Sequence, residues 1–393
     1  KTVKNAKVAA KRLDDDISYS VVGKKIKVYF IENEVYFGRD ALYGDTNGDY
    51  PDNLDRFAYF CCRCLELLKE IKFKPDIIHC HDWQSALVPV FLKKKFFADP
   101  FYKNIKTLFT IHNIGYQGLF LKDEFPKLGL DWSLFTVDTF EFYDKVNILK
   151  GGLVFSDIIN TVSPTYSKEI QTKAFGFGLE GVLEKRKSAL FGILNGIDYS
   201  IWCPETDKQI ARNYSATDIA GKAVNKADLQ KLCKLPVIKD IPLVGIVSRL
   251  AEQKGFDILA EAIDTICRMK LQMVILGAGD AKYQNLLAEM TKKYPNVISL
   301  SIKFDDALAH KIYAGSDIFL MPSKYEPCGL GQLISLSYGA IPLVFKTGGL
   351  ADTVNSKNGF VFDDYSSAAL IKTMTAATQA YSDGKKWAAL VKR

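Results

Sequence analysis

Short apolar and β-branched runs alternate along this chain with longer segments in which apolar residues recur at helical spacing. The first half contains the runs Lys27–Ile31, Ile77–His81, Thr107–His112, Ile158–Val162 and Ala189–Leu194. The second half contains the runs Leu243–Ser248, Gln272–Leu276, Val297–Leu300, Ile318–Met321, Ile341–Phe345 and Gly359–Phe362. This alternation predicts an α/β fold with parallel sheets whose strands are joined by crossover helices.

A turn-rich segment separates the two halves. The stretch from Asn195 to Pro204 is rich in turn-forming residues, and the sequence that follows is polar as far as Asp228. Domain boundaries commonly fall in segments of this kind. The pattern therefore predicts two Rossmann-like doubly wound domains, residues 1–196 and 197–393, which face a central cleft.

The composition excludes several classes of function. The 393 residues are 48% hydrophobic, as expected of an ordinary globular chain. No stretch approaches the roughly 18 to 20 apolar residues of a membrane-spanning helix, so we expect no membrane partner. The formal net charge of +7 is mild, and no basic block carries interleaved aromatic residues. Binding to nucleic acid is therefore not expected, whereas a small anionic ligand or a polysaccharide is compatible with this charge.

The cysteines and the start of the chain bear on the cellular compartment. Cys61 and Cys64 have CxxC spacing, but they lie inside the amphipathic run Phe57–Leu68. We interpret them as buried thiols rather than as a redox or metal site, which favours a reducing compartment. The segment Lys1–Arg12 is basic and lacks the apolar core of a signal peptide. These features predict a cytoplasmic location, or the plastid stroma if the source is a plant or an alga.

The strongest candidate for chemistry is a single carboxylate in the second half. The apolar run Ile318–Met321 leads into a turn that contains Glu326 and is rich in Pro and Gly, and a helical pattern begins near Leu330. The run Ile341–Phe345 ends in a Gly-Gly turn before another helical pattern. Two helix N-termini would then open beside one carboxylate, as a site for an anionic ligand requires.

Two cations and a glycine-rich turn follow earlier strands of the second half. Arg249 could hold two oxygens of a phosphate while Lys254 supplies a point charge, although a solvated, salt-bridged turn would have the same spacing. Gly277 and Gly279 form a GxG turn, but Lys282 replaces the third glycine of a dinucleotide-binding motif. The GxG turn alone is therefore weak evidence for a NAD-type site.

The first half places three of the four histidines at predicted strand ends. His79 and His81 share one face of a strand and could chelate a metal ion with His112. Polar residues that cap strand ends without any ligand are a second interpretation. We favour a third, a sugar-binding wall in which His112 contacts hydroxyl groups and Asp82 orients an acceptor.

Taken together, these segments resemble the bacterial glycogen synthase and plant starch synthase family over nearly the whole chain. The matching stretches are Tyr36–Arg39, Tyr50–Asn53, His79–Trp83, Thr110–Ile114, Leu194–Asp198, Ser248–Gly255, Glu326–Leu330 and Thr347–Asp352. The resemblance implies a GT-B fold. It further implies transfer of glucose from ADP-glucose to the nonreducing end of an α-1,4-glucan, or a maltooligosaccharide, with retention of configuration, no metal and no cofactor.

The resemblance also implies roles for individual residues. Arg249 and Lys254 would hold the diphosphate, and Glu326 would lie near the donor glucose. His112 would contact the glucosyl 6-hydroxyl. The four residues with implied catalytic roles are Glu326, His112, Arg249 and Lys254. Those with implied substrate-binding roles are Asp82, Asn195, Gln253, Phe304, Tyr325, Cys328, Gly329, Leu330, Thr347, Gly348 and Gly349, with Phe304 packing on the adenine.

Two departures from the family pattern qualify this interpretation. Family members normally begin with a strand and a Lys-x-Gly-Gly-Leu loop that helps to hold the diphosphate, whereas this chain starts beyond that point. The sequence also stops at Arg393, about where family members have a terminal helix that crosses back to the first domain. A catalytically weakened glucan-binding or regulatory relative is therefore the alternative. Sucrose-synthase-type relatives carry a second glutamate eight residues after the first, where this chain has Ile334. That position favours the glycogen and starch synthase group.

Overall fold

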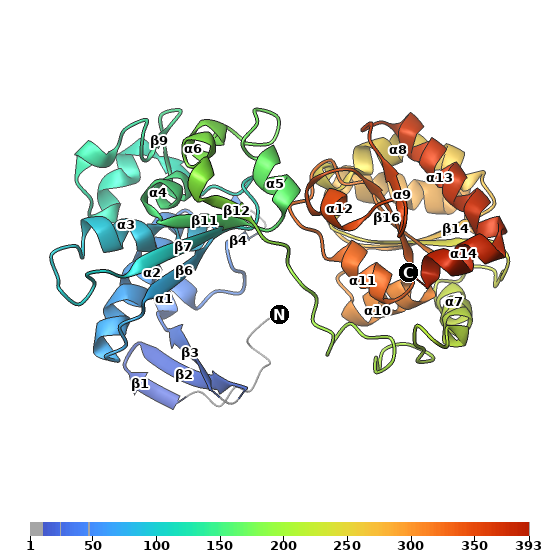
Figure 1. Ribbon diagram of the computed structural model, residues 1–393, viewed down its shortest axis with the longest axis horizontal. Coiled ribbons are helices and arrows are strands. Elements are labelled where there is room, and N and C mark those ends of the chain that lie inside the picture. The colour runs from blue at the N-terminus through green and yellow to red at the C-terminus, as the bar shows by residue number, and fades with distance from the viewer. Residues whose placement is uncertain (1–10, 24, 46–47, 393) are drawn as a thin grey trace. The chain divides into compact units, whose positions relative to one another are not determined.

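The computed structural model describes residues 11–23, 25–45 and 48–392, which form two compact units. The first unit contains the described residues up to Asn160 together with Gly176–Phe191. The second contains Thr161–Phe175 and the chain from Gly192 onward. The short segment Thr161–Phe175 therefore belongs to the second unit, although the chain enters it from the first and returns to the first afterwards (Figure 1). Only the last two residues of the basic segment Lys1–Arg12 are described.

A four-stranded sheet in the order β12-β11-β7-β6 forms the centre of the first unit. Its strands are β6 (Ile77–His81), β7 (Lys106–Ile111), β11 (Ile158–Thr161) and β12 (Leu190–Gly192), and β6 and β7 are parallel, as the sequence predicts. Helices α2 (Asn53–Glu70), α3 (Leu87–Lys94) and α4 (Ile148–Phe155) pack in sequence beside one another. Close packing of α4 requires Gly152, since a Cβ there would lie 2.6 Å from the Cβ of Ala86.

The prediction that Lys27–Ile31 is a strand of the parallel pattern is wrong in its pairing. The residues do form a strand, β3 (Ile26–Ile31), but it pairs antiparallel with β2 (Ile17–Val22), which pairs with β1 (Lys11–Asp14). A tight connection containing Gly23 at φ 63° joins β2 to β3, and such a connection allows only antiparallel pairing. Further elements of this unit are β4 (Gly44–Asp45), β5 (Gly48–Asp49), β8 (Leu119–Leu121), β9 (Glu141–Phe142), β10 (Lys145–Asn147), α1 (Glu34–Phe37) and α6 (Glu180–Lys185).

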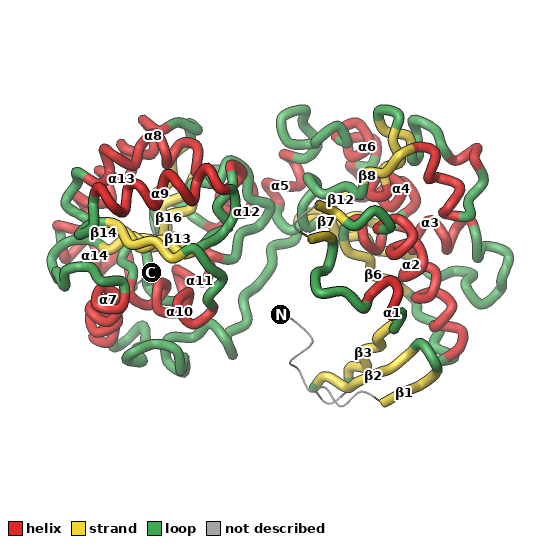
Figure 2. The backbone as a smooth tube through the Cα atoms, turned by 180° about the vertical axis from the view of Figure 1, so that it is seen from behind, coloured by secondary structure: helices red, strands yellow, loops and turns green. Residues whose placement is uncertain are grey.

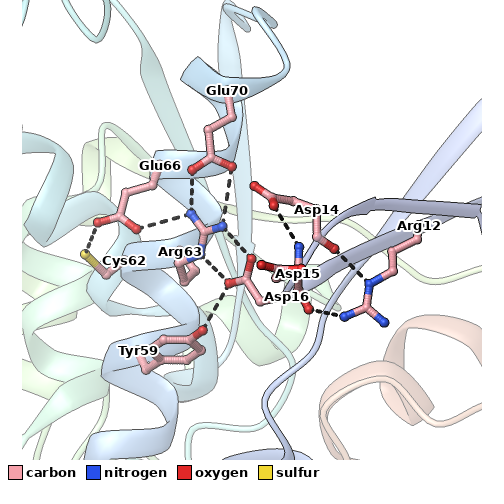
Figure 3. A network of polar contacts seen from close by, with 9 residues as sticks. All are labelled: Arg12, Asp14, Asp15, Asp16, Tyr59, Cys62, Arg63, Glu66 and Glu70. Carbon is pink, nitrogen blue, oxygen red and sulfur yellow. Dashed lines mark hydrogen bonds and ion pairs between the residues drawn. The ribbon is translucent and has the colours of Figure 1, made fainter.

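An ion-pair network attaches the start of this antiparallel sheet to α2 (Figure 3). The Arg63 guanidinium donates to both carboxylate oxygens of Asp16, at 2.8 and 2.9 Å, and also bonds Glu66 and Glu70. The Tyr59 hydroxyl donates to Asp16 as well. Hydrogen bonding from Arg63 lowers the pKa of Asp16 from its ordinary value of 3.8. These contacts connect the segment between β1 and β2 to helix α2. None of the residues in the network is a predicted site residue.

The second unit is built on a six-stranded parallel sheet in the order β15-β14-β13-β16-β17-β18. Its strands are β13 (Leu243–Val247), β14 (Gln272–Leu276), β15 (Ile298–Ser301), β16 (Ile318–Met321), β17 (Ile341–Phe345) and β18 (Phe360–Phe362). The predicted bounds of β14, β16 and β17 are confirmed, those of β13 and β18 differ by one residue at one end, and those of β15 differ by one residue at each end. Strand order reverses direction between β13 and β16, which makes that junction the topological switch point of the sheet.

Helices cover both faces of this sheet (Figure 2). Alternate strand residues point to opposite faces, so Met273 and Ile275 belong to one core while Val274 and Leu276 belong to the other. The first core is completed by α8 (Phe256–Cys267), α9 (Ala281–Lys293), α13 (Ser367–Ser382) and α14 (Gly384–Val391). The second is completed by α7 (Ala220–Leu232), α10 (Asp306–Gly315) and α11 (Gly331–Ser337). Helices α5 (Pro164–Glu169) and α12 (Gly348–Thr353) pack against each other.

Candidate active site

The switch point of the second unit brings together the predicted cations and the predicted carboxylate. Arg249 and Lys254 lie in the loop after β13, and Glu326 lies in the turn after β16, the two strands that flank the reversal. Ligands in doubly wound sheets bind outside the carboxyl ends of the strands at this point. We call residues 249–254 and 323–326 the switch-point region.

Lys254 and Glu326 form a direct ion pair in this region. The Lys254 Nζ lies 2.6 Å from Oε2 of Glu326, and the Ser323 hydroxyl donates to the same oxygen at 3.0 Å. The Glu326 side chain is 8% exposed and that of Lys254 is 21% exposed. Burial of a carboxylate is costly unless it is paired and hydrogen bonded, and both conditions are met here.

The same loops are joined by further hydrogen bonds. Arg249 Nη2 donates to the side-chain oxygen of Gln253 at 3.2 Å. The Gln253 carbonyl accepts from the Lys324 amide at 2.9 Å, and its side-chain amide donates to the Tyr325 carbonyl at 3.5 Å. The predicted side chains therefore form two bonded sets on the same two loops, Arg249 with Gln253 and Lys254 with Glu326.

The carboxylate at the start of α12 is Glu169, which the sequence analysis did not identify. Its Oε1 and Oε2 accept from the Gly348 amide at 3.0 and 3.1 Å, and Oε1 also accepts from the Thr347 hydroxyl at 3.2 Å. The start of α12 lies beside Glu326, as expected from the sequence, but its contact there is with the Glu326 carbonyl, which accepts from the Gly349 amide. The Glu326 side chain bonds Lys254 and Ser323 instead, and the N-terminus of α11 has no side-chain cap.

The Gly-Gly turn packs tightly on the backbone around Glu326. The Gly349 amide donates to the carbonyls of Glu326 and Pro327, at 3.1 and 3.2 Å. A Cβ on Gly348 would lie 2.0 Å from the Glu326 carbonyl oxygen, and one on Gly349 would lie 2.1 Å from that of Cys328. The sequence Gly348-Gly349 is thus required by close approach, and at Gly348 also by its φ of 43°.

The neighbouring predicted residues differ in accessibility. Cys328 is buried, burial raises the pKa of its thiol, and the Asn195 backbone hydrogen-bonds the sulfur. Gly329 adopts φ 71°, and Gln332 donates to the carbonyls of both Cys328 and Gly329. Leu330 is 45% exposed. This turn is rigid at Cys328 and presents Leu330 to solvent.

A cavity of about 570 Å³ adjoins the switch-point region within the second unit. Arg249 and Phe304 both line it, and Phe304 is 95% exposed, so its ring is free of packing in the protein. Trp202 also lines the cavity, stacked on the ring of His310 with centroids 4.0 Å apart. Trp202 was not expected from the sequence, because the pattern around an isolated Trp in a turn-rich segment does not indicate its packing partner.

Gly277 and Gly279 have a structural explanation that does not involve a dinucleotide. A Cβ on Gly277 would lie 1.9 Å from the Ser248 carbonyl oxygen, and one on Gly279 would lie 2.2 Å from that of Leu250. Leu250 also pairs with Gly279 as an isolated parallel bridge. The GxG turn therefore lets the loop after β13 approach the loop after β14.

In the first unit, His79, His81, Asp82 and His112 lie together at the carboxyl ends of β6 and β7, and we call them the histidine region. His81 Nδ1 lies 3.0 Å from His112 Nε2, and Asp82 accepts from the His112 amide at 2.7 Å. Burial lowers the pKa values of His79 and His81 and raises that of Asp82. Burial thus disfavours the charged form of each of these three groups.

The histidine region is also the candidate metal site of the sequence. His79 hydrogen-bonds the Thr110 hydroxyl at 2.6 Å, while His81 and His112 bond each other. Across the described residues, no group of three His, Cys, Asp or Glu side chains is arranged to hold a metal ion.

Within the same part of the chain, no helix is long and apolar enough to cross a membrane. His112 and Asp82 are the two predicted site residues of the first unit, and the others lie in the second.

Two protein families match successive parts of the chain. The family described as "Starch synthase catalytic domain" matches residues 3–185. The family described as "Glycosyl transferases group 1" matches residues 233–390. Together the two matches cover the strands of the described sheets except β12 (Leu190–Gly192).

Similar proteins cover the chain more completely. A glycogen synthase from Geotalea uraniireducens is 54% identical over 375 residues, which is 94% of this chain and 78% of the relative. A glycogen synthase from Fervidobacterium nodosum is 48% identical over 376 residues, covering 94% of this chain and 76% of the relative.

Solved structures agree in fold. The catalytic domain of Starch Synthase IV from Arabidopsis thaliana, bound to ADP and acarbose, is similar with a TM-score of 0.87 and 36% identity. That match covers 96% of this chain and 79% of the other. Sucrose-phosphate synthase from Thermosynechococcus elongatus has a TM-score of 0.60 and 17% identity, covers 97% of this chain and 79% of the other, and shows the fold alone. The predicted GT-B fold with two Rossmann-like domains is confirmed.

Proposed function

Because the chain belongs to the glycogen synthase and starch synthase family, we propose that it is a glucosyltransferase acting on ADP-glucose and an α-1,4-glucan. It transfers glucose to the nonreducing end of the glucan, or of a maltooligosaccharide, and retains the anomeric configuration. The similar plant domain was solved with ADP and acarbose, which supports a nucleotide and a glucan-like sugar as ligands here.

The observation that carries the proposal is the buried Lys254–Glu326 pair at the switch point, with Arg249 bonded to the same loop. A glycosyl transfer separates charge: the departing diphosphate becomes more negative and the anomeric carbon becomes more positive. A site with fixed charges of both signs can stabilise both developments without reorganising. Arg249 and Lys254 serve the diphosphate, and Glu326 serves the sugar.

The donor fits the second unit in a definite order. Its adenine packs on the exposed ring of Phe304 at the cavity, whose wall includes Trp202 and Arg249. Its diphosphate then meets the Arg249 guanidinium, which can bond two oxygens at once. Lys254, which bonds Glu326, adds a second fixed positive charge to the diphosphate from the same loop.

The bonding changes balance without a further reactant. The bond between the anomeric carbon and the diphosphate oxygen breaks, and the electron pair stays with ADP. The glucan hydroxyl attacks from the face that the leaving group vacates, and its proton passes to the departing phosphate oxygen. The anomeric carbon therefore keeps its configuration, and no metal ion or cofactor is needed.

The remaining predicted residues have roles in sugar recognition under this proposal. His112 and Asp82 contact sugar hydroxyls from the first unit, where burial lowers the pKa of His81 and raises that of Asp82 and so disfavours their charged forms. The substrate-binding residues contributed by the second unit are Asn195, Gln253, Tyr325, Cys328, Gly329, Leu330, Thr347, Gly348 and Gly349. The Gly348 and Gly349 amides already bond Glu169 and the Glu326 carbonyl, so those two glycines contribute shape more than donors.

We extend the proposal to location. All eight cysteines are free thiols, as expected in a reducing compartment, so we propose the cytoplasm, or the plastid stroma for a plant or algal source.

The experiment that tests the activity uses the protein with maltoheptaose and either ADP-glucose or UDP-glucose. We expect chain elongation and ADP release, with ADP-glucose preferred. A NAD arm tests the dinucleotide alternative. Binding of maltoheptaose without elongation on either donor would instead support the weakened glucan-binding relative and would contradict the proposal.

A further inference from the structure

Helices α5 and α12 of the second unit cap each other's N-termini with carboxylates. Asp352, near the end of α12, accepts from the Thr165 amide at 3.1 Å, from the Thr165 hydroxyl at 2.6 Å and from the Ser163 hydroxyl. Glu169, the last residue of α5, caps the start of α12 at Gly348. The two helices thus form a reciprocal clasp, in which only the Glu169 end touches the Gly-Gly turn.

The Glu169 carboxylate is held in a costly environment. Burial raises the pKa of Glu169, and the nearby charge of Asp352 raises it further. Hydrogen bonds from Gly348 and Thr347 offset part of that cost. A half-buried carboxylate that engages one amide with both oxygens fixes the direction of that N–H and the start of the helix behind it.

The clasp connects to the catalytic turn through consecutive residues. Gly348 bonds Glu169, and the next residue, Gly349, donates to the carbonyls of Glu326 and Pro327. The contact leaves no slack, because a Cβ on Gly348 would lie 2.0 Å from the Glu326 carbonyl oxygen. A shift of the turn would therefore reach the Glu326 backbone through the hydrogen bonds that the Gly349 amide makes to the carbonyls of Glu326 and Pro327.

We propose that Glu169 is a positioning residue for glucosyl transfer: it fixes the Thr347–Gly349 turn, and through that turn it sets the backbone of Glu326. The proposal rests on the proposed catalytic role of Glu326. Glu169 bonds the turn and touches neither Lys254 nor the Glu326 carboxylate in the described contacts. Its loss should therefore lower kcat while donor affinity, set by Arg249 and Phe304, changes little.

The test compares three variants. Glu169→Ala removes the acceptor, and Glu169→Gln keeps one neutral oxygen that can still accept from Gly348. Asp352→Asn is the matched control, because it weakens the other end of the clasp and leaves the start of α12 capped. We expect kcat to fall about twentyfold in Glu169→Ala, about threefold in Glu169→Gln and less than about twofold in Asp352→Asn, with the KM for ADP-glucose within about threefold of wild type.

Hydrogen exchange of the peptide covering residues 347–353 provides a readout that does not need activity. We expect the Gly348 and Gly349 amides to exchange faster in Glu169→Ala than in Asp352→Asn, even if the two substitutions lower the melting temperature by the same amount. Equal exchange in the two variants overturns the proposal, as does a kcat for Glu169→Ala within about twofold of wild type or of Asp352→Asn. If wild type transfers no glucose but exchange behaves as expected, the proposed function fails while the link from Glu169 to the turn stands.

Discussion

The switch-point region and the histidine region both lie at the carboxyl ends of parallel strands, yet their electrostatics are opposite. Lys254 and Glu326 bond each other directly as ions, side chain to side chain. In the histidine region, Asp82 bonds a backbone amide, two histidines bond each other, and burial disfavours the charged forms of Asp82, His79 and His81. The same strand-end topology therefore provides one site suited to developing charge and another suited to neutral hydroxyl groups.

Glu326→Gln should produce the largest effect. The amide keeps the shape of the side chain and can still accept from Ser323, but it removes the negative charge that stabilises the cationic sugar. We expect kcat to fall at least about a hundredfold, or about 3 kcal/mol of transition-state stabilisation, while calorimetry shows ADP binding at least as tightly as before. Normal turnover in a variant that melts earlier would reduce Glu326 to a structural partner of Lys254.

Arg249→Ala and Lys254→Ala test the positive half of the switch-point region. Each removes a cation aimed at the departing diphosphate, so each should cost about a hundredfold in kcat/KM for ADP-glucose, or about 3 kcal/mol. Lys324→Ala is the matched control, since Lys324 lies in the neighbouring turn after β16, and its exposed ammonium group contacts Glu252 at 3.7 Å and the ring of Tyr365 at 5.9 Å. Turnover within about twofold of wild type in both the Arg249 and the Lys254 variant would contradict the proposal that these residues hold the diphosphate.

His112→Ala tests the histidine region and should have a smaller effect. Loss of one hydrogen bond to an uncharged sugar hydroxyl should lower kcat/KM about tenfold. His79→Ala is the control: its ring bonds Thr110, and we expect activity within about twofold of wild type. If both variants lost activity equally, the region would support the strand ends rather than bind the sugar.

Asp16→Asn should have the smallest effect and none on transfer. Arg63 lowers the pKa of Asp16, so the stability that the pair contributes is present above the ordinary value of 3.8 and is lost as pH falls through the lower folded value. The variant should therefore melt slightly below wild type at pH 7, and the difference should shrink below about pH 4. A gap in melting temperature that stayed constant across that range would show that the pair acts by packing alone.

The sequence predicted much of the fold because parallel strands leave a local signal. Buried strands such as Gln272–Leu276 and Ile341–Phe345 are largely apolar runs, and their bounds agree with the structure. The strand Ile26–Ile31 was recognised, but its partner was not, because apolar pattern alone does not distinguish parallel from antiparallel pairing. The tight turn at Gly23 indicates antiparallel pairing, because strands joined by so short a connection cannot be parallel.

The gathering of the candidate residues was predictable from the sequence, but the bonds between them were not. Arg249, Lys254 and Glu326 each follow a strand, so their gathering at one sheet edge could be expected from the sequence. Glu169 could not, because it lies 179 residues before Gly348 and ends a six-residue helix with no unusual pattern. Trp202 was missed for the same reason, as its ring is placed by a stacking partner from a different helix.

The sequence by itself determined which segments form strands, which turns contain glycine and which charged side chains follow the strands. Each of these features depends on neighbours along the chain. Only the tertiary structure decided that Lys254 pairs with Glu326, and that the carboxylate at the start of α12 belongs to α5. Both contacts join segments far apart in sequence. They form because crossover connections in a doubly wound sheet bring loop ends to one edge, and because buried charges and helix ends must find partners there.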